Sequence, residues 1–306
     1  MVSGAMTRGI KRGRIKQTRF DFVTSVIIIV ILIMVLLIVA YPLIYVISAS
    51  ISEPIAVHSG KMILWPVDIT FEGYQRIFRD NTVLIGFSNS IVYTTVGVVL
   101  NIVMTVLGAY PLSRKDLVGR NAFMGIFAFT MFFSGGLIPS YLVVKMLGLN
   151  NTMWALVIPP AISVYNMIVM RTYFETSIPS EIYDASTIDG CDDYQYLFRV
   201  LLPLSMPIIA VMVLFYGSGH WNMFFDAIIY IRDSARYPLQ VILRNILIKN
   251  VVPMDMMDEA SLRESIRAGE IIKYALILIS TVPMMVAYPF IQKYFAKGVL
   301  VGSIKG

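Results

Sequence analysis

The sequence predicts an all-α polytopic membrane protein with six transmembrane helices. Hydrophobic residues make up 57% of the 306 residues, charged residues only 14%, and the mean hydropathy is +0.74. A soluble domain carries about 25% charged residues, so this chain lacks the charge that would cover a soluble surface. Six apolar stretches approach the length of about 20 residues that a bilayer requires. The composition therefore argues against a soluble enzyme, a disordered chain and a nucleic-acid-binding protein.

The six stretches differ in their interruptions. The first has no charged residue and is longer than the apolar core of a secretory signal, which has about 7 to 15 residues. The second contains asparagine and glycine, which indicates that it faces protein. The third is interrupted by a serine-glycine-glycine run and Pro139, the fourth by Pro159-Pro160, and the sixth by Pro283 and Pro289. The expected spans are residues 24–47, 87–112, 122–144, 153–170, 204–231 and 272–291.

Basic residues next to the expected spans predict the orientation. They concentrate in the N-terminal tail, in the loop between the second and third spans, and in the C-terminal tail. With six spans these three segments lie on one side, and basic loops are typical of the cytoplasmic side. We expect both termini in the cytoplasm, a cytoplasmic tail over 1–21 and a single transmembrane domain over 22–306. The basic residues are Arg8, Lys11, Arg12, Arg14, Lys16 and Arg19, then Arg114, Lys115 and Arg120, then Lys293, Lys297 and Lys305.

The chain contains no sequence motif of a phosphate-binding loop, a dinucleotide site or a zinc hydrolase. The chain has one cysteine, Cys191, so it can form neither an internal disulfide nor a cysteine-based metal cluster. Its two histidines are too few for a histidine metal site unless carboxylates complete it. Ionisable residues inside spans usually mark ion or proton pathways, and Asp226 is the main one here. We therefore expect no catalytic residue, no metal and no cofactor on this chain, and an energy source on another protein.

The cytoplasmic segment 171–203 differs from the basic loops because it carries six acidic and two basic residues. Its pattern predicts a short helix over 180–188, a left-handed turn at Gly190, and a second helix capped by Asp192 or Asp193. A compact acidic helix-turn-helix is better suited to docking on a protein partner than to acting as a solvated loop. The expected apolar face of the second helix comprises Tyr194, Leu197, Phe198 and Leu201, before Pro203 ends it.

The same segment resembles the EAA loop of ABC importer permeases, in which Glu-Ala-Ala precedes Asp-Gly and an apolar helix that closes on Leu-Pro. Asp184-Ala185-Ser186 stands at the first position, Asp189-Gly190 at the second and Leu202-Pro203 at the third. The resemblance implies a type I ABC importer (MetI-like) permease fold and a loop that couples the chain to an ATPase. The implied coupling residues are Glu181, Asp184, Ala185, Ser186, Asp189, Gly190, Phe198 and Pro203.

Further motifs over residues 20–306 narrow the resemblance. Asn89-Ser90 and the run Ala-Tyr-Pro-Leu-Ser-Arg at 109–114 are similar to sugar-importer permeases related to the smaller subunit of the maltose permease. Segments 133–139, 221–222 and 237–240 resemble oligosaccharide permeases of the LplC/YtcP type, which neighbour the alginate and rhamnogalacturonan importer permeases. The resemblance implies the permease of an ATP-driven importer for oligosaccharides, including polysaccharide-derived and acidic ones, in the bacterial cytoplasmic (inner) membrane.

The resemblance also implies a set of partners. They are a second, homologous permease subunit, two ATPase subunits that carry ATP and magnesium, an external solute-binding protein, the oligosaccharide and the lipid bilayer, with no nucleic acid. This chain itself would be a transport subunit and not an enzyme. The alternative is a stand-alone secondary carrier or channel, which would need coupling charges or a polar stripe in the spans.

Aromatic and polar side chains in a cavity bind sugars, and several of the spans contain such residues. Packing or interface anchoring is the commoner role of an aromatic residue in a bilayer, so both interpretations stay open for each of them. The same holds for His220, where packing is the commoner alternative. The candidates for the substrate path are Phe132, Ser134, Asn166, Tyr216, Trp221 and Asn222.

Overall fold

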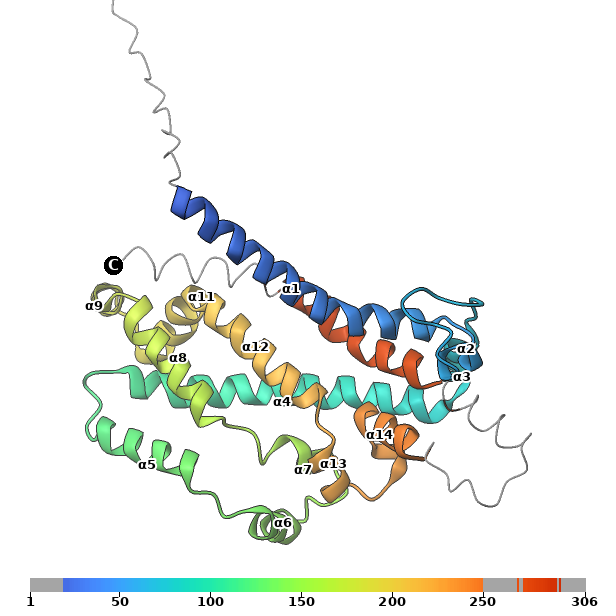
Figure 1. Cartoon of the computed structure of the whole chain (residues 1–306). Coiled ribbons are helices and arrows are strands. Elements are labelled where there is room, and N and C mark those ends of the chain that lie inside the picture. The colour runs from blue at the N-terminus through green and yellow to red at the C-terminus, as the bar shows by residue number, and fades with distance from the viewer. Residues whose placement is uncertain (1–18, 250–268, 270–271, 291, 293–306) are drawn as a thin grey trace, which may run out of the picture.

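The computed structural model describes residues 19–249, 269, 272–290 and 292 (Figure 1). Within these residues every regular element is helical. Residues 1–18, 250–268 and 293–306 lie outside the described residues. The basic residues of the C-terminal tail, and all those of the N-terminal tail except Arg19, therefore lie outside them as well.

The helix α4 (Asn81–Ser113) runs along the length of the molecule and organises its packing (Figure 1). The helices α12 (Met206–Trp221) and α8 (Val164–Ser177) pack against it. Asn101 and Thr105 on α4 are fully buried in this contact. The expectation that this polar span faces protein is therefore confirmed.

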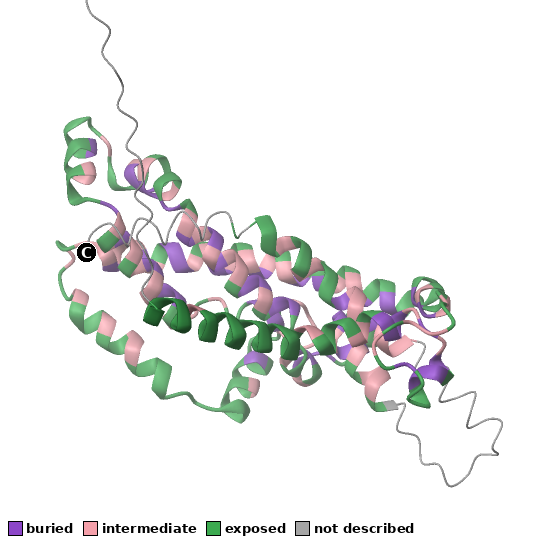
Figure 2. Ribbon diagram, turned by 45° about the horizontal axis from the view of Figure 1, so that its top comes forward, coloured by how far each residue is buried: buried purple, intermediate pink, exposed green. Residues whose placement is uncertain are grey.

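Two further helices match expected spans closely. The helix α1 (Arg19–Ser50) has 32 residues, and its apolar side chains are exposed along most of its length (Figure 2). An apolar surface of this size is costly in water, so α1 requires lipid or protein around it. The helix Ile272–Phe290 lies beside α1 (Figure 1), and Tyr45 and Tyr274 meet edge to face at a centroid distance of 6.0 Å.

The third expected span is broken at the serine-glycine-glycine run that interrupts it in the sequence. The helices α5 (Arg120–Phe132) and α6 (Leu137–Met146) meet at an angle of 111°. Ser134 and two glycines occupy the break, and Gly136 has a φ of +82°. Residues with a side chain rarely adopt this conformation, so the glycine permits the chain to turn here.

The fourth expected span is also interrupted. The helix α7 (Trp154–Val157) ends just before Pro159-Pro160, and α8 begins only at Val164. Proline has no backbone N–H to continue a helix and clashes with the preceding turn. Ser163 caps α8, because its hydroxyl accepts a hydrogen bond from the Asn166 N–H at 3.4 Å.

The fifth expected span is bent at its start and broken near its end. The helix Asp193–Leu204 meets α12 at 79° around Ser205, so the helix ends one residue beyond Pro203. After α12, the chain forms the short helix α13 (Phe225–Tyr230). In the described residues, three helices are long and apolar enough to span a membrane, and the bent pairs raise this to five. The expected count of six is not confirmed.

Two sequence motifs that are far apart in the chain meet near the N-terminal end of α4. The Asn89 side-chain amide donates to the carbonyl oxygens of Ala235 and Tyr237, at 2.9 and 3.1 Å. The Ser90 hydroxyl accepts from the Leu239 N–H at 2.8 Å. These bonds join α4 to the segment that leads into α14. The remaining elements at this end are α2 (Pro54–His58), α3 (Glu72–Arg79), η2 (Ser234–Arg236) and α14 (Leu239–Lys249).

Candidate functional site

Residues 180–204 form a helix-turn-helix at the opposite end of the molecule. The helix α9 (Ser180–Ile188) has the bounds that the sequence predicts. Gly190 has a φ of +83° and reverses the chain. The Asp192 carboxylate then accepts from the Gln195 N–H at 2.7 Å and caps α10 (Asp193–Gln195). The predicted helix, left-handed turn and cap are confirmed.

The second helix continues as a π-helical turn, η1 (Tyr196–Leu201), and ends in α11 (Leu202–Leu204). Leu197 and Leu201 are buried, whereas Tyr194 and Phe198 have exposed fractions of 75% and 59%. The prediction that these four side chains share one face is therefore wrong. A π-helical turn holds more residues than the 3.6 of an α-helix, so the expected three- and four-residue spacing no longer defines a single face.

The side chain of Arg114 fastens α9 to the end of α4. Its guanidinium carbon lies 3.4 Å from the centroid of the Tyr183 ring, which is a cation–π contact. The hydroxyls of Tyr183 and Tyr110 both donate to Asp193 Oδ1, at 3.2 and 3.1 Å. Tyr196 packs edge-on against Tyr183 at a centroid distance of 4.9 Å. These five residues form what we call the α4–α9 clamp.

Asp116 orients the guanidinium in the clamp. Arg114 donates through Nε and Nη2 to the two carboxylate oxygens of Asp116, both at 3.1 Å. This hydrogen bonding holds the pKa of the Asp116 carboxyl below its usual value. The Asp116 side chain is 70% exposed, and such surface pairs contribute little stability. The Arg114–Asp116 pair therefore fixes the orientation of the guanidinium and contributes little to the free energy of folding.

Glu175 ties three helices together next to the clamp. Its carboxylate pairs with Arg120 at 2.6 Å and with Arg171 at 2.9 Å. Arg171 Nε also donates to the carbonyl oxygen of Leu112 at 2.8 Å. The start of α5, the C-terminal turns of α8 and the end of α4 are thus held at fixed positions around the base of α9.

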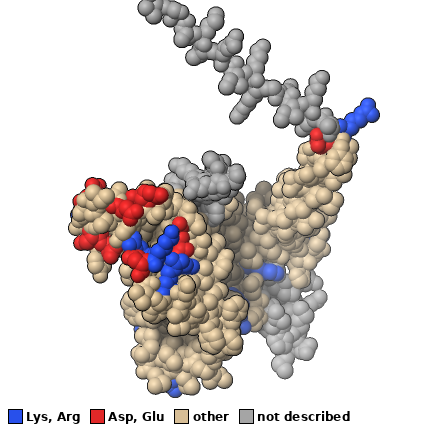
Figure 3. Space-filling model, turned by 90° about the vertical axis from the view of Figure 1, so that its left-hand side faces the viewer, with Lys and Arg blue, Asp and Glu red and all other residues tan. Residues whose placement is uncertain are grey.

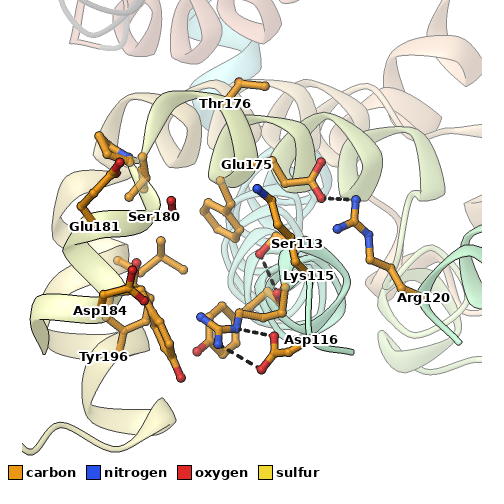
Figure 4. A pocket seen from close by; sticks show the side chains of 17 residues that line it. Ser113, Lys115, Asp116, Arg120, Glu175, Thr176, Ser180, Glu181, Asp184 and Tyr196 are labelled. Carbon is orange, nitrogen blue, oxygen red and sulfur yellow. Dashed lines mark hydrogen bonds and ion pairs between the residues drawn. The ribbon is translucent and has the colours of Figure 1, made fainter. Parts of the chain in front are cut away.

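A cleft of about 690 Å³ opens between α9, the end of α8 and the loop 114–120 (Figure 4). Glu181 and Asp184 project from α9 at one wall, and Lys115 comes from the loop at another. None of these three side chains has an ion-pair partner in the described part of the chain. Figure 3 shows that acidic and basic side chains gather at this end, above a surface that is mostly uncharged.

The coupling residues expected from the sequence all lie on this helix-turn-helix. Ser186 is buried, and its hydroxyl donates to the Ile182 carbonyl oxygen at 2.7 Å, so it stabilises α9 internally. The others are exposed: Glu181, Asp184, Ala185, Asp189, Gly190, Phe198 and Pro203.

A second pocket, of about 370 Å³, lies between α8, α12 and α13. It brings together three of the expected substrate-path residues, Asn166, Tyr216 and Asn222. The Tyr216 hydroxyl is committed to a hydrogen bond with Thr105 Oγ1 at 2.7 Å. We call this cavity the α12 pocket.

The other three expected substrate-path residues lie elsewhere. Trp221 is buried, and its Nε1 donates to the Ser280 carbonyl oxygen at 2.8 Å. Its ring meets Phe87 edge to face at 5.8 Å. Phe132 and Ser134 are exposed at the break between α5 and α6, and neither lines the α12 pocket. Within the described residues, no group of three or more His, Cys, Asp and Glu side chains could hold a metal ion.

No protein-family model matches the chain. The polygalacturonan/rhamnogalacturonan transport system permease YtcP of Bacillus subtilis is 42% identical over 266 residues, which cover 87% of this chain and 92% of the relative. This chain belongs to the sugar ABC transporter permeases. The protein LplC of the same organism is 40% identical, and the aligned region covers 87% of this permease and 89% of LplC.

Solved structures agree with this assignment. A chain in the crystal structure of a bacterial ABC transporter for import of the acidic polysaccharide alginate is 36% identical, with a TM-score of 0.83 over 91% of the permease and 99% of that chain. A chain of the alginate transporter in complex with a pentasaccharide-bound periplasmic protein has 14% identity and a TM-score of 0.58, covering 89% and 93%. The second match shows the fold alone. The expected ABC importer permease fold is confirmed, and the permease is a membrane protein.

Sequence reasoning missed the clamp of this permease. Tyr110 and Arg114 belong to the motif at 109–114, but nothing local in the sequence pairs them with Tyr183 and Asp193. One signal could have indicated the contact. The motif at 109–114 leads into the basic loop between the second and third expected spans, and that loop and the helix-turn-helix were both expected on the cytoplasmic side.

Proposed function

We propose that the permease is the transmembrane subunit of an ATP-driven importer for oligosaccharides and forms half of the translocation path. The observation that carries this proposal is the 42% identity with a transport-system permease over 87% of the chain. The helix-turn-helix at the charged end of the molecule supports it, because such an element suits a protein partner. A stand-alone carrier or channel is disfavoured by the family and by the scarcity of charged residues in the spans.

The coupling proposal assigns a role to each part of the helix-turn-helix. The exposed carboxylates of Glu181, Asp184 and Asp189 would meet the ATPase. Gly190 would set the turn, and the α4–α9 clamp would transmit movement of α9 to α4. Two packed elements that move together can rock a helix bundle between inward-open and outward-open states.

The energy for transport would come from partner proteins. We infer that ATP and Mg²⁺ bind to two ATPase subunits and that this chain has no ATPase site or cofactor of its own. A second, homologous permease would supply the other half of the path. An external solute-binding protein would deliver the oligosaccharide, by analogy with the alginate transporter that was crystallised in complex with a pentasaccharide-bound periplasmic protein.

The orientation proposal places the charged end of the molecule in the cytoplasm. The helix α1 ends and α4 begins at the end that carries α2 and α3 (Figure 1), so Arg19 and the loop 114–120 lie toward the other side. Basic loops favour the cytoplasmic side. We therefore infer a multi-pass protein of the bacterial cytoplasmic membrane with both termini inside.

The substrate proposal is an oligosaccharide derived from a polysaccharide, acidic ones included. Asn166, Tyr216 and Asn222 are the substrate-path residues that share a pocket. Phe132 and Ser134 would join the path where a sister subunit covers the α5–α6 break. Trp221 is better explained by packing, because its ring and its N–H both face protein.

The test is a pull-down of the tagged chain from native membranes in mild detergent, followed by mass spectrometry. We expect a second permease and an ATPase to co-purify. Replacing Glu181, Asp184 and Asp189 together by lysine should release the ATPase and retain the sister permease, because the three side chains are exposed. A well-folded chain that purifies without any ATPase would refute the proposal and favour the carrier.

A further inference from the structure

The α12 pocket contains polar groups whose hydrogen-bonding capacity is unused. The Asn166 amide and the Asp226 carboxylate have no hydrogen-bond partner within the described residues, and both line the pocket. Asn222 donates through Nδ2 to the Ser218 carbonyl oxygen at 3.0 Å, which leaves its amide oxygen as a free acceptor. Three side chains from α8, from the end of α12 and from α13 thus offer hydrogen bonds to one cavity.

His220 adds a fourth group, and its neighbours assign its tautomer. The Asn101 Nδ2 donates to the Pro160 carbonyl oxygen at 2.5 Å, so Asn101 Oδ1 is the atom 2.6 Å from His220 Nε2. Because an amide oxygen only accepts, Nε2 carries the hydrogen, and Nδ1 of the neutral ring is an acceptor. His220 lines the pocket and is 5% exposed, and its Nδ1 has no hydrogen-bond partner in the described part of the chain. Such a buried orphan acceptor calls for a donor.

Aromatic rings line the same cavity. Phe215, Phe224 and Phe225 have exposed fractions of 45%, 45% and 55%. Exposed rings beside unpaired amide, carboxylate and imidazole groups are typical of small-molecule sites, in which apolar walls hold the ligand and a few polar groups orient it. Sugar rings have apolar faces for the phenyl groups and hydroxyl donors for the acceptors.

The charge of the pocket limits the ligand further. No lysine or arginine is among the described residues that line it, and Asp226 places a carboxylate there. A ligand carboxylate would meet a like charge in a weakly screened site, whereas a hydroxyl could donate to Asp226. The pocket therefore favours a sugar ring without a carboxyl group.

We propose that the α12 pocket binds one uncharged ring of the transported oligosaccharide, with His220 Nδ1 and Asp226 accepting hydrogen bonds from its hydroxyls. An oligosaccharide that also contains uronate rings can still place a neutral ring here. This inference rests on the proposed import function and adds to it a site and a substrate class.

The test uses two probes that differ only at C6, methyl α-D-galactopyranoside and methyl α-D-galactopyranosiduronate. Binding to the purified complex in detergent is measured by saturation-transfer difference NMR. We expect the galactoside to bind at least about tenfold more tightly than the uronate, because the uronate carboxylate faces Asp226. Asp226→Asn should narrow this difference.

His220→Gln separates ligand binding from folding. A glutamine amide can still donate toward Asn101 in place of Nε2–H, but it removes the Nδ1 acceptor. We expect weaker galactoside binding, by about tenfold, and an unchanged thermal unfolding midpoint. Thr172→Ala, at an exposed position of α8 outside the pocket and outside the expected substrate path, is the control and should alter neither quantity.

Three results would overturn the site. The first is equal binding of the two probes to the unmodified complex, and the second is galactoside binding that survives both His220→Gln and Asp226→Asn unchanged. Absence of galactoside binding in a complex that retains its ATPase would also reject the site while leaving the import function standing. Galactoside binding by a chain that never recruits an ATPase would reject the import function and leave the site standing.

Discussion

Arg114 places its guanidinium 3.4 Å from the centroid of the Tyr183 ring and thereby joins the end of α4 to α9. The same tyrosine donates to Asp193, which also accepts from Tyr110 on α4. Movement of α9 relative to α4 would break the cation–π contact and interrupt the hydrogen-bond bridge from Tyr183 through Asp193 to Tyr110. The proposed docking helix is therefore mechanically connected to the helix that organises the membrane domain.

Tyr183→Leu removes the ring and the hydroxyl, and we expect it to weaken the coupling of ATP hydrolysis to transport. The cation–π contact contributes about 0.5 to 2 kcal/mol and the hydrogen bond about 1 kcal/mol. The number of ATP molecules hydrolysed per sugar imported into proteoliposomes should rise severalfold. Tyr183→Phe keeps the ring and should have a smaller effect. An unchanged ratio in a fully assembled Tyr183→Leu complex would contradict the role of the clamp.

Gly190→Pro should release the ATPase from the complex. Gly190 has a φ of +83°, whereas proline is restricted to a φ near −65°, so the turn between α9 and α10 cannot form. Gly190→Asn is the matched control, because asparagine tolerates the left-handed conformation best among residues with a side chain. The measurement is the amount of ATPase that co-purifies. Normal retention with Gly190→Pro would argue that this turn does not set the docking geometry.

Gly97→Ala should destabilise the fold by about 1 to 3 kcal/mol. A methyl group on Gly97 would lie 2.5 Å from His220 Nε2 and displace the ring from Asn101. Gly125→Ala on α5 is the control, since no atom of the residues that the structure describes lies within 4 Å of its added methyl group. Glycine-to-alanine changes in open helical positions are otherwise favourable. Thermal unfolding in detergent should show a lower midpoint for Gly97→Ala only, and equal midpoints would refute the close approach.

Trp221→Phe tests whether this tryptophan packs or binds sugar. The change removes the donor to the Ser280 carbonyl oxygen and should cost about 1 to 3 kcal/mol. Because Trp221 is 4% exposed and does not line the α12 pocket, we expect galactoside binding to be unchanged. Trp154→Phe, at a half-exposed side chain, should leave the unfolding midpoint near that of the unmodified protein. Loss of binding without loss of stability would return Trp221 to the substrate path.

The helix-turn-helix was predictable residue by residue because its signals are local. Proline before α9, glycine after it and aspartate before α10 act on their immediate neighbours, and the structure has each of them in the expected place. The apolar face beyond them was mispredicted at Tyr194 and Phe198, because a π-helical turn at Tyr196–Leu201 alters the spacing. The pattern of hydrophobic residues does not predict that π-helical turn.

The expected spans show the same limit. Hydropathy counts apolar residues over a window and reports nothing about direction, so a stretch bent by 111° and a straight helix look alike. The Gly136 and Pro159-Pro160 interruptions were visible in the sequence. Whether they bend, break or merely loosen a helix depends on the packing around them.

The membrane class, the family resemblance and the docking segment could all be predicted from the order of the residues, because composition and capping act over short distances along the chain. Which side chains meet was decided by the packing of the helices. That packing turned Trp221 toward Ser280, placed Arg114 on Tyr183, and gathered Asn166, Asn222 and Asp226 at one pocket. These contacts depend on how helices cross and on the rotation of each about its axis, which are set between segments more than 50 residues apart, such as Trp221 and Ser280.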